Sequence, residues 1–200
     1  MGNWNGAYSQ KNPLNTFRTR ALRTLSVPLE YVLLAGLGVL AVALHQALRF
    51  PMQLPGRHGI EWMALLIVGR VASRQRGAGS VVGVGAAAAS LLPMWAAGED
   101  PLAWLTYLIP GLLVDLAYAA LPRWRANLVF LASLGGLTFA TKPLLRWIVS
   151  LATGLPQPSL LLGLGYPLAT HLLFGALGAF LGAVVALGVQ KFILPPAGQD

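Results

Sequence analysis

The chain has no cysteine and few charged residues. Six of its 200 residues are Asp or Glu and 14 are Lys or Arg, so charged residues make up 10% of the chain. The lack of cysteine excludes disulfides, iron–sulfur clusters and thiolate chemistry. Ordinary soluble domains carry roughly 25% charged residues, whereas 56% of this chain is hydrophobic. These proportions predict an all-α polytopic membrane protein, with room for about six spans of ~20 residues each.

The chain also lacks the short motifs of soluble enzymes. It has no phosphate-binding loop with its lysine, no Gly-x-Ser-x-Gly elbow and no helix with paired metal ligands. The glycines between Arg76 and Gly85 resemble those of a nucleotide-binding loop. Because they stand at the start of an apolar helix and no strand precedes them, we interpret them as a tight cytoplasmic turn. We therefore predict no catalytic residue and no enzyme activity. The net charge is +8, but the positions of the basic residues along the chain fit a membrane topology, so we expect no nucleic-acid partner.

Six apolar segments predict six transmembrane helices. They cover about residues 28–48, 59–71, 80–97, 102–121, 126–141 and 160–189. The second segment is short, and we expect Arg70 to extend it by snorkelling toward the cytoplasm. Lys142-Pro143 interrupts the run after the fifth segment, so residues 143–154 are predicted to form an amphipathic helix on the outer surface. Continuation of the fifth helix is the alternative.

The distribution of basic residues predicts the orientation. Cytoplasmic loops are enriched in Lys and Arg, and ten of the fourteen basic residues fall on one side of this layout. Both termini are therefore predicted to be cytoplasmic. Residues 1–26 would form a basic cytoplasmic arm, 27–191 the six-helix transmembrane domain and 192–200 a short tail. The ten residues are Lys11, Arg18, Arg20, Arg23, Arg70, Arg74, Arg76, Arg123, Arg125 and Lys191.

Five ionisable residues are predicted to lie at membrane depth. Such groups are costly in hydrocarbon and usually face a partner or a cavity, although a hydrogen-bonded packing role between helices is the alternative for each. We expect Asp115 and His171 in particular to lie in the bundle interior. The other three are His45, Glu61 and Lys142.

Small residues recur in the last apolar segment at helical spacing. Gly175, Ala179 and Ala183 stand four residues apart, and Gly178 with Gly182 forms a second register. Small side chains at this spacing let helix backbones approach closely in a membrane. We predict that these five residues pack against neighbouring helices.

Aromatic residues gather near the predicted external boundary. They form either an interfacial belt, with each polar tip in water, or the wall of a pocket for a flat ligand, closed by the first, third and fifth loops. The residues are Trp62, Trp95, Trp104, Tyr107, Trp147 and Tyr166.

The three histidines are far apart in sequence and show no metal-ligand spacing. We therefore predict no metal site and no cofactor. Axial ligation of a b-type haem by His45 and His171 is the alternative.

Three motifs carry a family resemblance. They are Leu-Pro-Gly-Arg-His-Gly-Ile-Glu-Trp at 54–62, which leads to Gly69-Arg70 and the glycines at 77–79; Tyr-Leu-Ile-Pro-Gly-Leu-Leu-Val-Asp at 107–115; and His-Leu-Leu-Phe-Gly-Ala-Leu-Gly at 171–178. With six spans, the chain after Ser26 resembles the substrate-binding S component of energy-coupling factor (ECF) transporters.

The resemblance implies a multi-pass protein of the cytoplasmic membrane of a prokaryote that captures a vitamin-like or metal ligand at the outer face. A transmembrane coupling subunit and two ATPases would be its partners. The first span departs from the family because it has no clean pair of small residues for docking. The alternative is therefore a structural anchor subunit that contacts other membrane subunits of a larger, possibly redox, complex.

The predicted ligand-binding residues come mainly from the outer side. Lys142 and Arg146 favour an anionic or carboxylate-bearing small molecule, although a cationic pair at an interface also suits lipid phosphate. The remaining outer candidates are His58, Glu61, Trp62, Trp104, Tyr107 and Tyr166, with Asp115 and His171 as deeper contacts.

Overall fold

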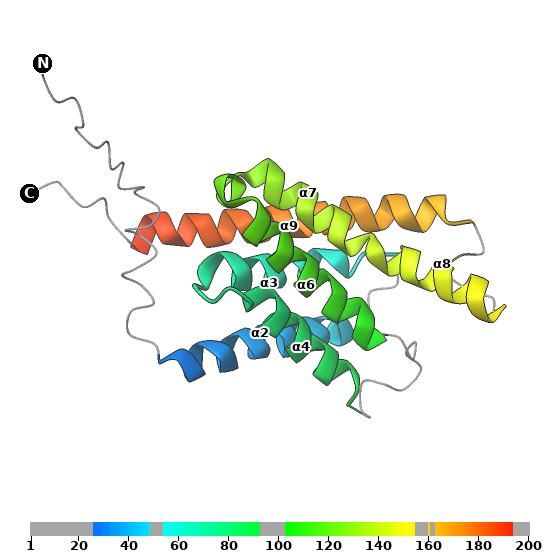
Figure 1. The fold of residues 1–200 in the computed structure, drawn as a ribbon, viewed down its shortest axis with the longest axis horizontal. Helices are drawn as coiled ribbons and strands as arrows, with labels where there is room; N and C mark the ends of the chain where they lie inside the picture. Colours follow the sequence, from blue (N-terminus) through cyan, green and yellow to red (C-terminus); the bar gives the residue numbers. More distant parts are fainter. Residues whose placement is uncertain (1–25, 49–53, 93–102, 155–159, 161–162, 194–200) are drawn as a thin grey trace, which may run out of the picture.

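A computed structural model describes residues 26–48, 54–92, 103–154, 160 and 163–193, with side chains up to 190, and every regular element in these ranges is a helix (Figure 1). The all-α prediction is confirmed, and a helix lies within or close to each of the six apolar segments. The elements are α2 (Val27–Ala47), α3 (Gly59–Ala72), α4 (Ala78–Ser90), α6 (Ala103–Ala120), the 3-10 turn η1 (Pro122–Trp124), α7 (Leu128–Phe139), α8 (Thr141–Thr153) and α9 (Gly165–Ile193).

Successive helices run in opposite directions, except that α8 continues in the direction of α7, and the start of α2 and the end of α9 lie at the same end of the bundle (Figure 1). The turns after α3 and α6 also lie there, and they carry Arg74, Arg76, Arg123 and Arg125. We call this the basic end. The opposite end holds the end of α2, the start of α3 and the start of α9. We call it the histidine end because His45, His58 and His171 lie there.

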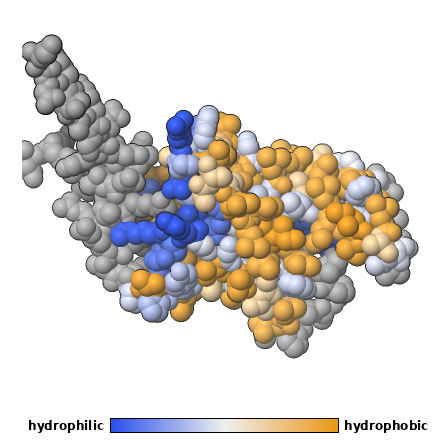
Figure 2. Space-filling view, viewed as in Figure 1, coloured by the Kyte–Doolittle hydropathy of each residue, from blue (hydrophilic) through white to orange (hydrophobic). Residues whose placement is uncertain are grey.

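In the described part of the chain, four helical stretches are long and apolar enough to cross a membrane. They are Val27–Ala47, Ala103–Ala120, Leu128–Thr153 and Gly165–Gln190. Their outer faces expose large apolar side chains, among them Val32, Leu116 and Val129, and apolar residues cover much of the molecule beyond the basic end (Figure 2). Side chains of this kind find their favourable environment in lipid. The chain is therefore a multi-pass protein embedded in a bilayer.

Helix α3 is enclosed by the other helices. Each of its 14 residues is buried or half-buried, and Met63, Leu66 and Ile67 are completely buried. Because other helices rather than lipid surround it, its short length leaves no backbone exposed to hydrocarbon. The expected snorkelling of Arg70 is wrong: this side chain is buried, with 4% of its surface exposed, because an acidic partner lies inside the bundle.

The two small-residue registers of α9 contact two different helices. A side chain at Gly178 or Gly182 would collide with the α3 backbone at Ile60 or Ala64. A side chain at Gly175 would instead meet Phe139 and Gly135 of α7, and Ala179 packs against Gly135 on the same side. Ala183 is completely buried as well. Close backbone approach thus fixes α9 between α3 and α7.

The helical run after α7 breaks at Ala140. Pro143 then falls in the first turn of α8, where its missing N–H leaves no helical hydrogen bond unmade. Helix α8 ends at Gly154, whose φ of +70° suits glycine. It is amphipathic: Ile148 and Leu151 are exposed, whereas Lys142 is buried against the bundle. The interruption predicted at Lys142-Pro143 thus lies two residues further along than the break itself.

Candidate functional site

Four basic or titratable side chains meet at the histidine end. His45 comes from the last turn of α2, His58 directly precedes α3, Lys142 lies in the first turn of α8 and His171 in the second turn of α9. We call these four residues the histidine–lysine cluster. It unites all three histidines of the chain, although 126 residues separate the first from the last.

His58 is the centre of the cluster. Its Nε2 lies 2.7 Å from Nζ of Lys142. Its ring centroid is 4.8 Å from that of His45 and 6.1 Å from that of His171. Desolvation by the surrounding groups, and then the positive charge of Lys142, lower the pKa of His58 well below its usual value. The imidazole is therefore neutral, and its Nε2 accepts a hydrogen bond from the Lys142 ammonium.

The orientation of His171 is fixed by its neighbours. Its Nδ1–H donates to the carbonyl oxygen of Pro167 at 2.7 Å, and its ring stacks on Phe139 with centroids 4.9 Å apart. Gly56 has a φ of +81°, and a Cβ built there would lie 2.8 Å from Nδ1 of His171. Only glycine combines this conformation with such a close approach. In the neutral ring, this leaves the other nitrogen of His171, Nε2, as an acceptor.

The aromatic residues of this end fall into two groups. The rings of Trp62 and Tyr107 are buried and meet edge to face at 5.2 Å, and Nζ of Lys142 lies 5.8 Å from the Tyr107 ring centroid. Trp104 is half-buried against the core, whereas Trp147 and Tyr166 are exposed. The buried rings border the cluster, whereas the exposed rings suit a membrane interface. Neither the pocket wall nor the interfacial belt therefore describes the whole aromatic set. Trp95 lies outside the described residues.

Two buried nitrogen atoms at this end make no hydrogen bond within the described part of the chain. They are Nε1 of Trp62 and Nδ1 of His45. The nearest carboxylate oxygen to the His45 atom is Oε1 of Glu61, at 3.9 Å, which is too far for a hydrogen bond. An unsatisfied buried polar group is costly and calls for an explanation.

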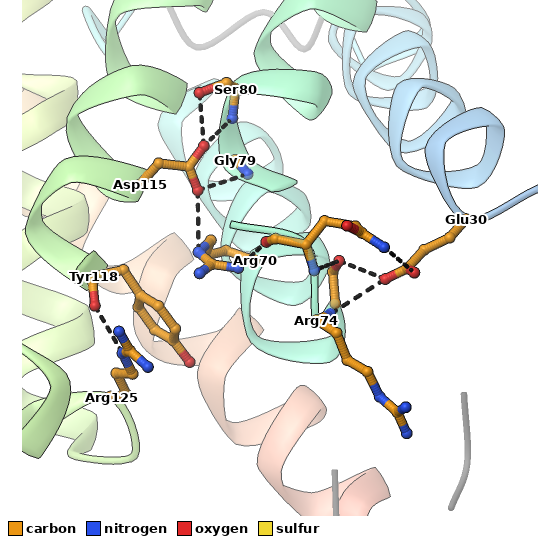
Figure 3. A network of polar contacts seen from close by, with 10 residues as sticks. Glu30, Arg70, Arg74, Gly79, Ser80, Asp115, Tyr118 and Arg125 are labelled. Carbon is orange, nitrogen blue, oxygen red and sulfur yellow. Dashed lines mark hydrogen bonds and ion pairs between the residues drawn. The ribbon is translucent and has the colours of Figure 1, made fainter. Parts of the chain in front are cut away.

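A separate polar network joins α3, α4 and α6 at the basic end (Figure 3). Oδ1 of Asp115 lies 3.0 Å from Nε of Arg70 and accepts the Gly79 N–H at 3.0 Å. Oδ2 accepts both the N–H and the hydroxyl of Ser80, each at 2.6 Å. Asp115 therefore caps the start of α4 and pairs with the Arg70 charge at the same time.

The same network extends to α2 and to the end of α6. Arg70 also donates to the Gln75 carbonyl at 2.8 Å, and its guanidinium carbon lies 4.2 Å from the Tyr118 ring centroid. Glu30, buried near the start of α2, accepts from the Ser73 hydroxyl at 2.6 Å and from the Gln75 amide at 3.0 Å. These bonds tie the turn between α3 and α4 to the helices on both sides.

The structure separates the predicted site residues into two places. Asp115 and His171 are both buried, as expected, but they lie at opposite ends of the bundle. Asp115 is engaged within the basic-end network. Half-buried Arg146 follows Lys142 by one turn of α8. At the cluster or directly beside it lie His58, Glu61, Trp62, Tyr107, Lys142 and His171.

Sequence reasoning missed three participants. His45 was considered as a membrane-depth packing residue and as a haem ligand, but not as a ligand-binding residue, and Phe139 and Gly56 were not singled out. The glycine of the Leu-Pro-Gly run was the available signal for Gly56. Among the described residues, no group of three His, Asp or Glu side chains could hold a metal ion. Haem ligation by His45 and His171 stays a hypothesis, and His58 now contacts the rings of both.

Comparison with protein-family models, with curated proteins and with solved structures finds no match.

Proposed function

We propose that the protein is a non-catalytic membrane subunit that binds a small anionic molecule at the histidine–lysine cluster, as the substrate-binding component of an ECF-type importer. One observation carries the proposal. Four basic or titratable side chains, distant in sequence, converge inside one end of an apolar bundle. Ionisable groups within a membrane bundle are rare and commonly mark the path or the site of a ligand.

The surroundings of the cluster favour a ligand over a packing role. A packing network would satisfy its own polar atoms, and in the basic-end network the one buried nitrogen without a hydrogen bond among the described residues, Nε of Arg70, still has the Asp115 carboxylate as an ionic partner at 3.0 Å. At the histidine end, the indole N–H of Trp62 has no acceptor among the described residues. A ligand that carries an acceptor atom would satisfy this N–H. A buried donor left without a hydrogen bond costs about 1–3 kcal/mol.

Charge indicates the ligand class. Lys142 contributes a buried positive charge, and Arg146 lies one turn further along α8. Glu61 is the acidic residue at this end in the described part of the chain. A carboxylate or phosphate beside Lys142 would be held by charge-assisted hydrogen bonds, with the rings of Tyr107 and Trp62 alongside. These features support an anionic, partly aromatic small molecule.

The orientation of the site follows from the positive-inside rule. We propose that the helices of all six apolar segments span the membrane and that the basic end, with both termini, faces the cytoplasm. The histidine end then faces outward, as capture of an external ligand requires. In the cytoplasmic membrane of a prokaryote, a coupling subunit and two ATPases would supply the energy for import.

The first test is gentle detergent extraction from the native membrane, followed by mass spectrometry of the small molecules and proteins that co-purify. A stoichiometric anionic molecule together with a coupling subunit and two ATPases is the expected result. Recovery in a cofactor-bearing assembly without an ATPase would replace the importer with an anchor subunit.

The second test assigns the ligand to the cluster. In Lys142→Met, the co-purifying molecule should be lost while the protein still elutes as a folded, monodisperse species. Arg123→Gln, which removes one exposed positive charge from the basic end, should retain it. Equal ligand content in Lys142→Met and wild type would contradict the proposed site.

A further inference from the structure

The turn between α6 and α7 carries a basic and aromatic surface that the proposed ligand site does not use. Arg123 and Trp124 are exposed on η1, with 51% of the Trp124 surface accessible. Arg125 is fixed in place: its Nε donates to the Tyr118 carbonyl at 2.7 Å, and its guanidinium carbon lies 5.1 Å from the Tyr118 ring centroid.

A second basic turn lies beside the first. Tyr118 is contacted by Arg70 as well as by Arg125, and Arg70 bonds to Gln75 in the turn that carries Arg74 and Arg76. Hydrophilic residues gather at this end of the molecule (Figure 2).

Positive charge is in excess at this end. Its acidic groups in the described part of the chain, Glu30 and Asp115, lie inside the polar network. The side chain of Arg74 points away from Glu30 (Figure 3). Arg76 and Arg123 are exposed and form no ion pair among the described residues.

Exposed apolar residues directly adjoin the basic turn. Leu116 lies about one turn before the end of α6 and has 67% of its surface exposed, and Val129, the second residue of α7, has 74% exposed. Leu121 is exposed between them. Exposed apolar residues therefore flank the basic turn and its exposed indole on both sides along the chain. Basic, indole and apolar side chains favour the headgroup, interface and acyl layers of a leaflet, respectively.

We propose that this surface binds an acidic phospholipid, with its phosphodiester against Arg123 and Arg125 and its acyl chains along Leu116 and Val129. The guanidinium groups supply paired donors for phosphate oxygens. Trp124 would sit at headgroup level, where an amphipathic ring is favoured. A lipid rather than free phosphate is indicated because the apolar flank continues directly from the basic turn.

The test uses the full chain in phosphatidylcholine nanodiscs with or without phosphatidylglycerol, and native mass spectrometry of the protein with its retained lipids. Wild type should retain phosphatidylglycerol in preference to phosphatidylcholine. Arg123→Gln should bind it about fivefold more weakly, because one Arg near an anionic surface contributes about a factor of that size. Arg57→Gln removes one positive charge at the histidine end, and this variant should retain phosphatidylglycerol as wild type does.

Three outcomes would overturn the proposal. They are equal retention of the two lipids by wild type, equal loss in Arg123→Gln and Arg57→Gln, and full displacement of phosphatidylglycerol by inorganic phosphate. Displacement would identify a site for free phosphate. Because Arg123 is exposed, its substitution should leave the melting temperature in phosphatidylcholine unchanged, so loss of lipid would not reflect unfolding. None of these results bears on the ligand at the histidine–lysine cluster.

Discussion

The two ends of the bundle treat buried polar groups in different ways. At the basic end, Asp115 pairs with Arg70 and caps α4, and Glu30 accepts bonds from the turn after α3. At the histidine end, the cluster is bordered by aromatic rings, and two buried nitrogens make no hydrogen bond within the described residues. The first arrangement holds helices together, whereas the second leaves an indole N–H and an imidazole nitrogen available to another molecule.

Removal of the Asp115 charge should give the largest loss of stability. In Asp115→Asn, Arg70 would remain buried without its ionic partner, which costs about 3–5 kcal/mol in the free energy of unfolding. Unfolding in mixed detergent micelles measures this value. The matched change at the histidine end, Glu61→Gln, should cost about 1 kcal/mol or less because the nitrogen of His45 that faces this carboxylate is 3.9 Å away, beyond hydrogen-bond distance. Similar losses in the two variants would remove the distinction between the ends.

A smaller loss is expected at the contact between α3 and α9. In Gly178→Ala, the added methyl group would press on the carbonyl oxygens of Gly59 and Ile60, which are backbone atoms and cannot rotate away. Overpacking of this kind costs about 1–3 kcal/mol. Gly188→Ala is the control, because its added methyl group meets no atom within 4 Å. Equal melting temperatures for the two variants would show that this contact is looser than the structure indicates.

The smallest effect concerns acidification. Because the pKa of His58 is lowered in the folded protein, the unfolded chain takes up a proton near pH 6.5 while the folded chain does not. Stability should therefore fall as the pH decreases below about 6.5, by at most about 1.4 kcal/mol per pH unit for this one group.

Melting temperatures of wild type and His58→Gln between pH 7.5 and 5.5 provide the measurement. The difference between the two profiles isolates His58 from His45 and His171. Parallel profiles would mean that His58 takes up a proton in the folded protein as readily as in the unfolded chain, which would contradict a lowered pKa in the folded state.

The positions of the helices could be predicted from the sequence because each helix depends on a local run of apolar residues. Residues 59–71, for example, match α3 to within one residue. The pairing of Arg70 with Asp115 could not be predicted, because it depends on how α3 and α6 pack, and the two residues are 45 positions apart in the chain. For the same reason, the three histidines looked unrelated until the packing of α2, α3 and α9 brought them together.

The aromatic residues show a second limit of sequence reasoning. Spacing placed Trp62 and Trp147 in one predicted boundary layer. Only the packing separates the buried Trp62 from the exposed Trp147. Depth in a membrane follows from position along a helix, whereas inward or outward orientation depends on the neighbouring helices.

The enclosure of α3 has a consequence for the order of assembly during synthesis. This helix carries Glu61 in its first turn and Arg70 in its last turn, and charged residues raise the cost of inserting an isolated helix, by up to about 2.5–3.5 kcal/mol each for one at the helix centre. Its closest backbone neighbour is α9, which leaves the ribosome last among the described helices. Until then α3 depends on α2 and α4 to shield it from lipid. A chain that stops before α9 would therefore be a substrate for membrane quality control, even with most of its helices inserted.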